Sequence, residues 1–231
     1  MSISENIEKL RNLLPKDVRL VAVSKTKPVS AVMEAYDAGQ RVFGENKAQE
    51  MIAKQPELPA DIEWHFIGHL QTNKVKYLIP FVSMIESVDS LKLLKEINKQ
   101  AVKADRKVNC LLQFHIASED TKFGLDTDEA RLLIESEAFA GMKNIVICGV
   151  MGMASFTTEE AVLRKEFSCL REYFNTLKNE YFSQNENFRE ISMGMSGDFQ
   201  MAVEEGSTVV RVGTAIFGVR DGGQGTGDEG E

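Results

Sequence analysis

The chain of 231 residues contains little cysteine and little proline, with 3 and 5 residues of each type. Cys110, Cys148 and Cys169 are widely spaced and form no C-x-x-C pair, which excludes a disulfide framework and a thiolate zinc site. We interpret these thiols as small buried apolar side chains in a reducing compartment. The hydrophobic share of 43% excludes a disordered or fibrous chain.

Long hydrophobic runs and an excess of positive charge are also missing. The longest apolar run, residues 145–154, is much shorter than the ~20 residues of a membrane-spanning helix. The first ten residues contain no basic stretch followed by an apolar one, so they do not resemble a secretion signal. The net charge of −8 disfavours binding to a nucleic-acid backbone. These absences predict a soluble cytoplasmic protein that contacts neither membrane nor nucleic acid.

What the sequence does contain is a regular alternation of short β-like runs with longer helical patterns. Most of the β-like runs are apolar on both faces, which is typical of a parallel sheet covered by helices. Eight such runs in a chain of this length favour a single closed (β/α)8 TIM-type barrel over an open doubly wound sheet. The predicted strands are residues 19–24, 41–44, 63–68, 82–88, 107–116, 144–151, 190–194 and 208–213.

The two ends of the chain have different patterns. Apolar residues recur at helical spacing over residues 4–14, and Ser2 with Glu5 predicts a capping box at the start of this helix. No helix is predicted after the eighth strand, because residues 221–231 are acidic and glycine-rich, as in disordered segments. We therefore expect one domain over residues 1–220, with the opening helix filling the gap in the outer ring.

Several helix ends carry their own signals. Gly39 predicts the end of the second helix, because glycine is the common residue just beyond a helix C-terminus. Asp126 with Glu129, and Thr157 with Glu160, each predict a helix N-cap paired with a reciprocal glutamate.

Chemistry is expected where the strands end. The active face of such a barrel lies at the carboxyl ends of its strands, and phosphate often binds after strands seven and eight. Ser196, Gly213 and Thr214 follow these two strands and predict a phosphate cup, helped by the free N–H groups of a helix over residues 198–205. Ordinary turns are the alternative interpretation of the same small residues. Two such segments at the expected positions favour phosphate.

Lys25 follows the first strand and is the most specific candidate for a reactive residue. Partial desolvation and the nearby cation Arg211 would both favour its neutral amine, which can attack a carbonyl carbon. Lys27 competes with it, because both lysines share strand parity with Val23. Spacing does not separate the two, although Pro28 indicates that Lys27 has already turned outward.

Two histidines and a serine motif were weighed as other kinds of site. His65 and His69 are four residues apart but straddle a strand end, so they do not share a helical face and predict no metal site. The sequence 194–198 approaches G-x-S-x-G but has Asp198 in place of the last glycine, which disfavours a hydrolase.

Five ordered segments resemble those of one family. AVSKTKP, FGEN, WHFIG-x-LQ-x-NK, SMGMS-x-D and GST-x-VR-x-GTAIFG extend over residues 19–220 and together resemble the pyridoxal phosphate homeostasis protein family. The resemblance implies a fold like the barrel domain of bacterial alanine racemase. It also implies pyridoxal 5′-phosphate (PLP) held as an internal aldimine, for buffering or delivery without established catalysis.

The resemblance also assigns roles to residues. Lys25 is the expected Schiff-base residue, and Arg211 resembles the arginine that meets the pyridine nitrogen. The departures are His69, where relatives commonly have proline, and Gly197, where several have aspartate. The phosphate contacts implied are Ser196, Gly213 and Thr214, and the residues implied near the ring are Asn46, His65 and Met193.

Three functions remain open at this point. We predict a PLP carrier or regulator of vitamin B6 pools, without catalytic residues or metal, monomeric, with PLP-requiring apoenzymes as candidate partners. A PLP-dependent amino-acid racemase is the alternative. Racemases on this type of barrel resemble two-base enzymes, in which a separate β domain supplies a tyrosine. We expect this chain to lack that domain, and we predict that the four tyrosines of this chain lie away from the barrel mouth. A Schiff-base aldolase that uses Lys25 without PLP would share the phosphate cup.

Overall fold

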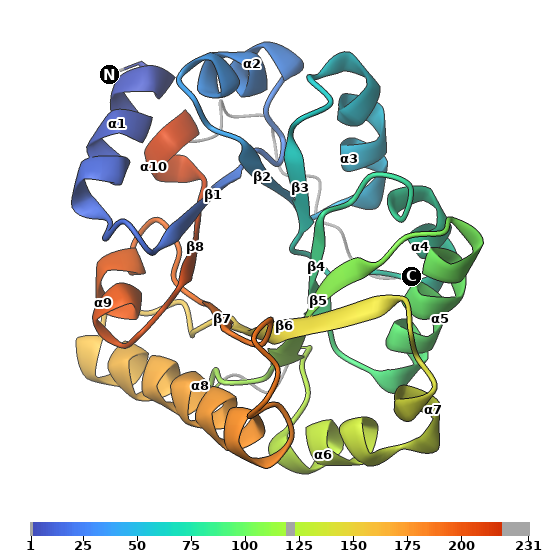
Figure 1. The fold of residues 1–231 in the computed structure, drawn as a ribbon. Coiled ribbons are helices and arrows are strands. Elements are labelled where there is room, and N and C mark those ends of the chain that lie inside the picture. Colours follow the sequence, from blue (N-terminus) through green and yellow to red (C-terminus); the bar gives the residue numbers. More distant parts are fainter. Residues whose placement is uncertain (1, 119–122, 219–231) are drawn as a thin grey trace, which may run out of the picture.

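The computed structural model describes residues 2–118 and 123–218. Eight parallel strands close into a barrel in chain order, and helices surround it (Figure 1). This confirms the predicted (β/α)8 fold. The strands are β1 (Arg19–Val23), β2 (Val42–Glu45), β3 (Glu63–Phe66), β4 (Met84–Val88), β5 (Val108–Phe114), β6 (Ile145–Gly152), β7 (Glu190–Ser192) and β8 (Val209–Val212).

The outer ring consists mostly of helices that follow the strands along the chain. The acidic segment 221–231 lies outside the described residues, so the predicted tail and domain boundary stay predictions. The helices are α1 (Ile3–Leu13), α2 (Val29–Asp37), α3 (Ala48–Lys54), α4 (Thr72–Leu78), α5 (Leu91–Lys103), α6 (Thr127–Glu135), α7 (Glu137–Ala140), α8 (Glu160–Glu180), α9 (Phe199–Glu204) and α10 (Thr214–Phe217), with a 3-10 turn, η1 (Gln55–Glu57).

The pairing of β1 with β8 closes the barrel and sets which side chains face its interior. Leu20 lies opposite Val210 in this parallel pair, and both pack in the core between the strands and the helices. Because side chains alternate along a strand, Val21 and Val23 point into the barrel. Lys25 continues this inward series beyond the end of β1.

A short helix follows β8, contrary to the prediction. In α10, the N–H groups of Ile216 and Phe217 both donate to the carbonyl of Gly213. Ile216 is fully buried, and its carbonyl accepts a hydrogen bond of 2.9 Å from the Asn6 side chain of α1. Burial of Ile216 and hydrogen bonds from the Asn6 and Lys27 side chains thus hold these four residues in place. As predicted, α1 lies in the outer ring, where it packs against α2 and against α10 on its inner side (Figure 1).

Two of the three predicted capping boxes are confirmed. Ser2 with Glu5 caps α1, and Asp126 with Glu129 caps α6. The prediction for Thr157 is wrong. Helix α8 begins at Glu160, its N-cap residue makes no capping bond, and the Thr157 hydroxyl accepts a bond from the N–H of residue 159 within the preceding loop.

The thiols and the membrane prediction can be checked against the described residues. All three cysteines are free, with Cys110 and Cys148 buried and Cys169 half-buried. Burial raises the pKa of the Cys148 thiol to about 11. That value is typical of an inert core thiol. Within residues 2–118 and 123–218, no helix combines the length and apolar character needed to cross a bilayer.

Candidate functional site

A cavity of about 1070 Å³ opens at the carboxyl ends of the strands. Loops after β1, β2, β3, β6, β7 and β8 form its wall, so it occupies the position predicted for the site. Most of the residues predicted for the site meet here, although they come from four separate loops. Those lining the cavity are Lys25, Asn46, Ser196, Arg211, Gly213 and Thr214.

The other two predicted residues lie behind the cavity wall. His65 is buried inside the barrel, with its Nδ1 atom 2.6 Å from Glu86 Oε1. Met193 is fully buried in the core between the strands and the helices. The structure therefore brings six of the eight residues to the cavity surface and leaves these two as supports.

A tight turn after β1 aims Lys25 at the cavity. The N–H of Lys27 donates to the carbonyl of Ser24 at 3.0 Å, which reverses the chain. Within this turn Thr26 has a φ of 64°, a left-handed conformation that is unfavourable for a β-branched residue. The Glu50 side chain compensates, because its Oε1 atom accepts a bond of 2.5 Å from the N–H of Thr26.

The same turn separates the two candidate lysines. Lys25 lines the cavity, whereas Lys27 does not. The ammonium of Lys27 donates to the carbonyl of Phe217 in α10 at 3.1 Å. The geometry thus favours Lys25, which sequence spacing alone could not do.

A buried ion pair supports this turn from the helix side of the barrel. The Lys54 ammonium lies 2.8 Å from Glu45 Oε1 and 2.7 Å from Glu50 Oε1, and donates to the carbonyl of Ser24 at 2.8 Å. The Ser24 hydroxyl donates to the same Glu45 oxygen at 2.6 Å. Burial raises the pKa of Glu45 in spite of Lys54 and Ser24, and its Oε2 atom is buried without a partner. We call Ser24, Glu45, Glu50 and Lys54 the turn support.

The predicted phosphate cup is built from two loops that meet at one hydroxyl. Ser196 Oγ accepts bonds from the N–H groups of Gly213 and Ala215, at 3.2 and 3.3 Å. A Cβ atom at Gly213 would lie 3.1 Å from the Val23 carbonyl, so the position suits only glycine well. A Cβ at Gly197 would meet nothing within 4 Å and would enter the cavity.

Donors in the cup come mainly from loops. The N–H groups of Ser196, Gly197 and Thr214 have no acceptor among the described residues. The start of α9 contributes less than predicted, because the carbonyl of Met195 already accepts from the N–H groups of Asp198 and Phe199.

Asp198 places a carboxylate at the same cavity wall. Its Oδ1 atom accepts a bond of 2.5 Å from the N–H of Met195, which holds the loop closed. Burial raises the pKa of this carboxyl above its usual range, and the Met195 bond only partly opposes the rise. A negative charge here would repel a bound phosphate.

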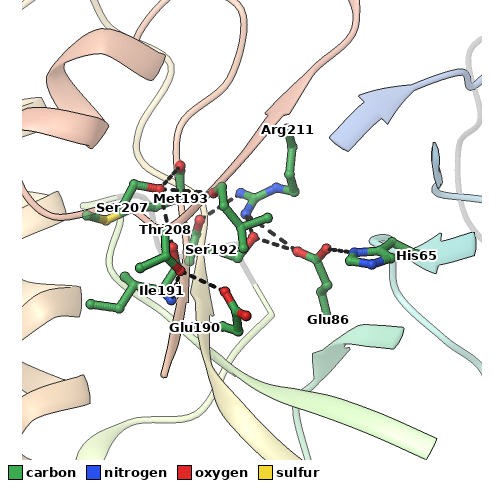
Figure 2. Close-up of polar contacts among 11 residues, drawn as sticks. His65, Glu86, Glu190, Ile191, Ser192, Met193, Ser207, Thr208 and Arg211 are labelled. Carbon is green, nitrogen blue, oxygen red and sulfur yellow. Dashed lines mark hydrogen bonds and ion pairs between the residues drawn. The ribbon is translucent and has the colours of Figure 1, made fainter. Parts of the chain in front are cut away.

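Arg211 lies at the floor of the cavity, in a buried polar network (Figure 2). Its Nη1 atom donates to Ser192 Oγ at 2.6 Å, and its Nη2 atom to the carbonyl of Gly152 at 2.8 Å. Ser192 Oγ in turn lies 2.5 Å from Glu86 Oε2, and Glu86 Oε1 contacts His65. Burial alone would raise the pKa of Glu86, but His65, Arg211 and Ser192 together hold it below its usual value.

The loop between β6 and α8 forms the far wall of the cavity. Glu166 of α8 is buried and accepts bonds from the N–H and hydroxyl groups of both Ser155 and Ser118, at 2.7 to 3.0 Å. Phe156 follows, lines the cavity and is 98% exposed. We call Glu166, Ser118 and Ser155 the loop clamp.

Sequence reasoning missed the turn support, the loop clamp and Glu86. A usable signal existed for Glu86, because a glutamate inside the otherwise apolar strand Met84–Val88 must be buried with a partner. The partners themselves come from strands far apart in the sequence, which no local pattern reveals.

The residues set aside as sites also have clear positions. His69 is exposed, stacks on Phe123 at 4.2 Å between ring centroids and lies 3.2 Å from Asp89, so it does not line the cavity. The described residues contain no cluster of three or more potential metal ligands. None of the tyrosines lines the cavity either, since all lie on helices or at a helix end: Tyr36, Tyr77, Tyr173 and Tyr181.

Comparison with solved structures agrees with this architecture. PipY of Synechococcus elongatus, solved without PLP, superposes with a TM-score of 0.86 at 38% identity, covering 94% of this chain and 100% of that one. The same protein with PLP bound gives a TM-score of 0.85 at 37% identity, with the same coverage. An alanine racemase of Clostridium difficile shares only 14% identity at a TM-score of 0.74, which shows a common fold over 56% of its chain.

Sequence comparison identifies the family. Residues 1–221 match the family model described as alanine racemase, N-terminal domain. The pyridoxal phosphate homeostasis protein of Aquifex aeolicus is 39% identical over 203 residues, which is 87% of each chain. The human protein of the same name is 37% identical over 235 aligned residues, covering 95% of this chain and 85% of the human one. This chain belongs to the pyridoxal phosphate homeostasis protein family, which has the alanine racemase N-terminal barrel fold.

Proposed function

We propose that this protein binds PLP through a Schiff base on Lys25 and serves in PLP homeostasis, by storage, delivery or regulation. The observation that carries the proposal is one cavity that is lined by both Lys25 and the Ser196–Thr214 phosphate cup. PipY, which shares the fold at 37% identity, has been solved with PLP bound.

The donor set of the cavity fits a phosphorylated aldehyde. The Ser196 and Thr214 hydroxyls and the loop N–H groups are hydrogen-bond donors for phosphate, and small residues keep the backbone accessible. PLP, when bound, supplies an aldehyde carbon that an amine can attack. Lys25 would provide that amine, and Asn46, which follows the neighbouring strand β2, would contact the ligand beside it.

Arg211 bears on what the bound cofactor can do. A permanent cation near the pyridine nitrogen disfavours a proton there, which weakens the ring as an electron sink. This fits a carrier, and it also fits a racemase. The absence of any tyrosine from the cavity lining supports the carrier, because a tyrosine base would have to reach this cavity. We therefore propose that the protein does not turn over amino acids.

Four further statements belong to this proposal. We propose PLP-requiring apoenzymes as acceptors, one domain over residues 1–220, a cytoplasmic location and a monomeric state. Free, buried thiols support a reducing compartment. The exposed large apolar side chains on helices lie on four different helices, α1, α4, α5 and α6, which supports the monomer. Phe156 and Met195 are also exposed, but they line the cavity. Sedimentation of the purified protein at two concentrations tests the monomeric state.

Borohydride trapping tests the central claim. Freshly purified protein is expected to absorb in the visible range and, after reduction, to carry one pyridoxyl group on the peptide that contains Lys25. Lys25→Ala should lose both signals, whereas Lys27→Ala, the matched control two residues away, should keep both. An adduct on another lysine, or none at all, would contradict the proposal. A wild-type protein that has no visible band but cleaves a sugar phosphate would instead indicate the aldolase.

Hydrogen exchange at the α-carbon separates the carrier from the racemase. The purified PLP-loaded protein is incubated in deuterated water with a panel of L- and D-amino acids, and deuterium uptake is measured by mass spectrometry. We expect no sustained uptake above the free-PLP background. Catalytic uptake for any amino acid would favour the racemase.

A further inference from the structure

The buried polar network crosses the interior of the barrel. Its members come from strands on different sides of the ring: His65 from β3, Glu86 from β4, Ser192 from β7 and Arg211 from β8. Figure 2 shows the four side chains in a row, from the guanidinium through the hydroxyl and the carboxylate to the imidazole. All four residues are buried.

The donor and acceptor chemistry fixes the direction of each bond. A guanidinium can only donate and a carboxylate can only accept. The Ser192 hydroxyl must therefore accept a hydrogen bond from Arg211 and donate one to Glu86 Oε2. His65 must donate from Nδ1 to the other oxygen of the same carboxylate, since Glu86 is held in its ionised form. The row has one self-consistent arrangement.

Charge explains why such a row exists. A buried guanidinium is costly unless a counter-charge is near. Glu86 Oε2 lies 3.9 Å from Arg211 Nη1, with Ser192 bonded to both groups. Burial lowers the pKa of Arg211, while Glu86 and Asp198 oppose the decrease. The guanidinium has five N–H donors. Its contacts with described residues use only Nη1 and Nη2, while its side chain still reaches the cavity surface.

We propose that Glu86 and His65 are positioning residues, which hold Arg211 through Ser192 as a fixed cation at the cavity floor, directed at the ring of the bound cofactor. This rests on the proposed function, because it assigns the ring side of the ligand to the floor of the same cavity. Neither residue lines the cavity, so both act on the ligand only through Arg211.

The test uses the full-length protein with Glu86→Gln, which keeps the size of the side chain and removes its charge. Without ligand, the Arg211 side-chain N–H signal in a 15N-correlated NMR spectrum, assigned by its loss in Arg211→Lys, should be sharp in the wild type and broadened in the variant. With PLP, the dissociation constant should rise roughly tenfold and the visible band should shift. A purely structural role for Glu86 would change stability without moving that band.

Glu190→Gln is the matched control. Glu190 is also a buried glutamate, on β7, but it contacts Thr208 and Arg19 and has no bond to Arg211. Its PLP affinity should stay within about twofold of the wild type, with the band and the Arg211 signal unchanged. If Glu86→Gln fails to fold, Ser192→Ala provides the test, since it keeps the charges of Glu86 and Arg211 and removes only the bridging hydroxyl. Ser192→Ala should change the PLP affinity, the visible band and the Arg211 signal in the same direction as Glu86→Gln, to a smaller extent.

The outcomes separate this inference from the proposed function. A folded Glu86→Gln or Ser192→Ala protein with wild-type affinity, band and Arg211 signal would overturn the positioning role, while a Lys25 adduct in the wild type would leave the carrier intact. A wild type without any Lys25 adduct would overturn the proposed function and, with it, the role of Arg211 toward PLP.

Discussion

Lys54 contributes to the geometry around Lys25 although it lies 29 residues away in the sequence. Its ammonium bonds the Ser24 carbonyl, while Glu50, another of its partners, bonds the N–H of the strained Thr26. The turn that presents Lys25 is thus fixed from behind the barrel by a buried ion pair. Such a pair is expensive to break, because removal of one partner leaves a buried charge.

Lys54→Met should therefore destabilise the protein by roughly 3–5 kcal/mol. Glu45 would stay buried without its counter-charge, and it already has one unpartnered oxygen. Chemical denaturation measures the loss, and borohydride trapping should show less adduct on Lys25. The double variant Glu45→Gln with Lys54→Met should recover part of the stability. The control Lys47→Met, an exposed lysine at the start of α3, should change stability by less than about 0.5 kcal/mol.

Asp198 predicts a pH effect at the phosphate cup. Asp198→Asn keeps the acceptor for the Met195 N–H and removes a negative charge from the cavity wall, so PLP should bind a few-fold more tightly. Burial raises the Asp198 pKa, so the wild-type carboxyl takes up its proton at a higher pH than an exposed aspartate would. The ratio of the two affinities, titrated by absorbance, should approach one as pH falls through that pKa. A ratio that does not change with pH would contradict this.

At the scale of elements, the loop clamp connects the start of α8 to two barrel loops. Glu166 accepts four hydrogen bonds and thereby fixes Ser118 after β5 and Ser155 after β6. These bonds hold the pKa of Glu166 below its usual value in spite of burial. A single carboxylate on a long helix thus shapes the cavity wall that carries Phe156.

Glu166→Gln should destabilise the protein by about 2–3 kcal/mol, because an amide can accept at only one of the two positions. The folded-state pKa of Glu166 is lowered, so its contribution is complete above the ordinary glutamate pKa and is lost as pH falls through the lowered value. The difference between variant and wild type in urea unfolding should therefore shrink in acid. Glu172→Gln, an exposed glutamate of the same helix, should match the wild type at every pH.

At the scale of the whole molecule, α1 completes the outer ring beside the four-residue helix α10. It packs on α2 and on α10, and its Ile7 and Leu10 side chains are buried in the main core. Closure of the barrel between β1 and β8 occurs beneath this helix (Figure 1). The N-terminal helix is therefore part of the barrel domain.

Ile7→Ala should destabilise the whole domain by roughly 2–4 kcal/mol, through lost burial and a cavity under α1. Urea unfolding followed by fluorescence and by circular dichroism should show one shared, shifted transition. Leu13→Ala, on the same helix but 48% exposed, should cost less than about 1 kcal/mol. A separate early transition for α1 alone would show instead that the helix is an independent appendage.

Local sequence patterns were sufficient to predict the barrel, its strands and the loops that line the cavity. Apolar strands alternate with helices throughout, and this periodicity depends only on local geometry. Local patterns failed where tertiary contacts decided the outcome. Thr157 has the sequence of a helix cap but lies in the cavity loop. The short helix α10 is held by burial of Ile216 and by a bond from Asn6 of α1, which lies more than 200 residues earlier in the chain.

The contacts that support the site depend on tertiary structure and could not be predicted from local sequence patterns. Lys25 lines the cavity, whereas Lys27 contacts α10 instead. His65 and Met193 lie behind the cavity wall, and Arg211 has the buried carboxylate of Glu86 as its partner. The alternation of side chains along a strand predicts which of them face the barrel interior. It does not predict which side chains from the opposite strands they will contact. That depends on how the closed ring brings β3 and β4 within bonding distance of β7 and β8, a relation between residues more than a hundred positions apart.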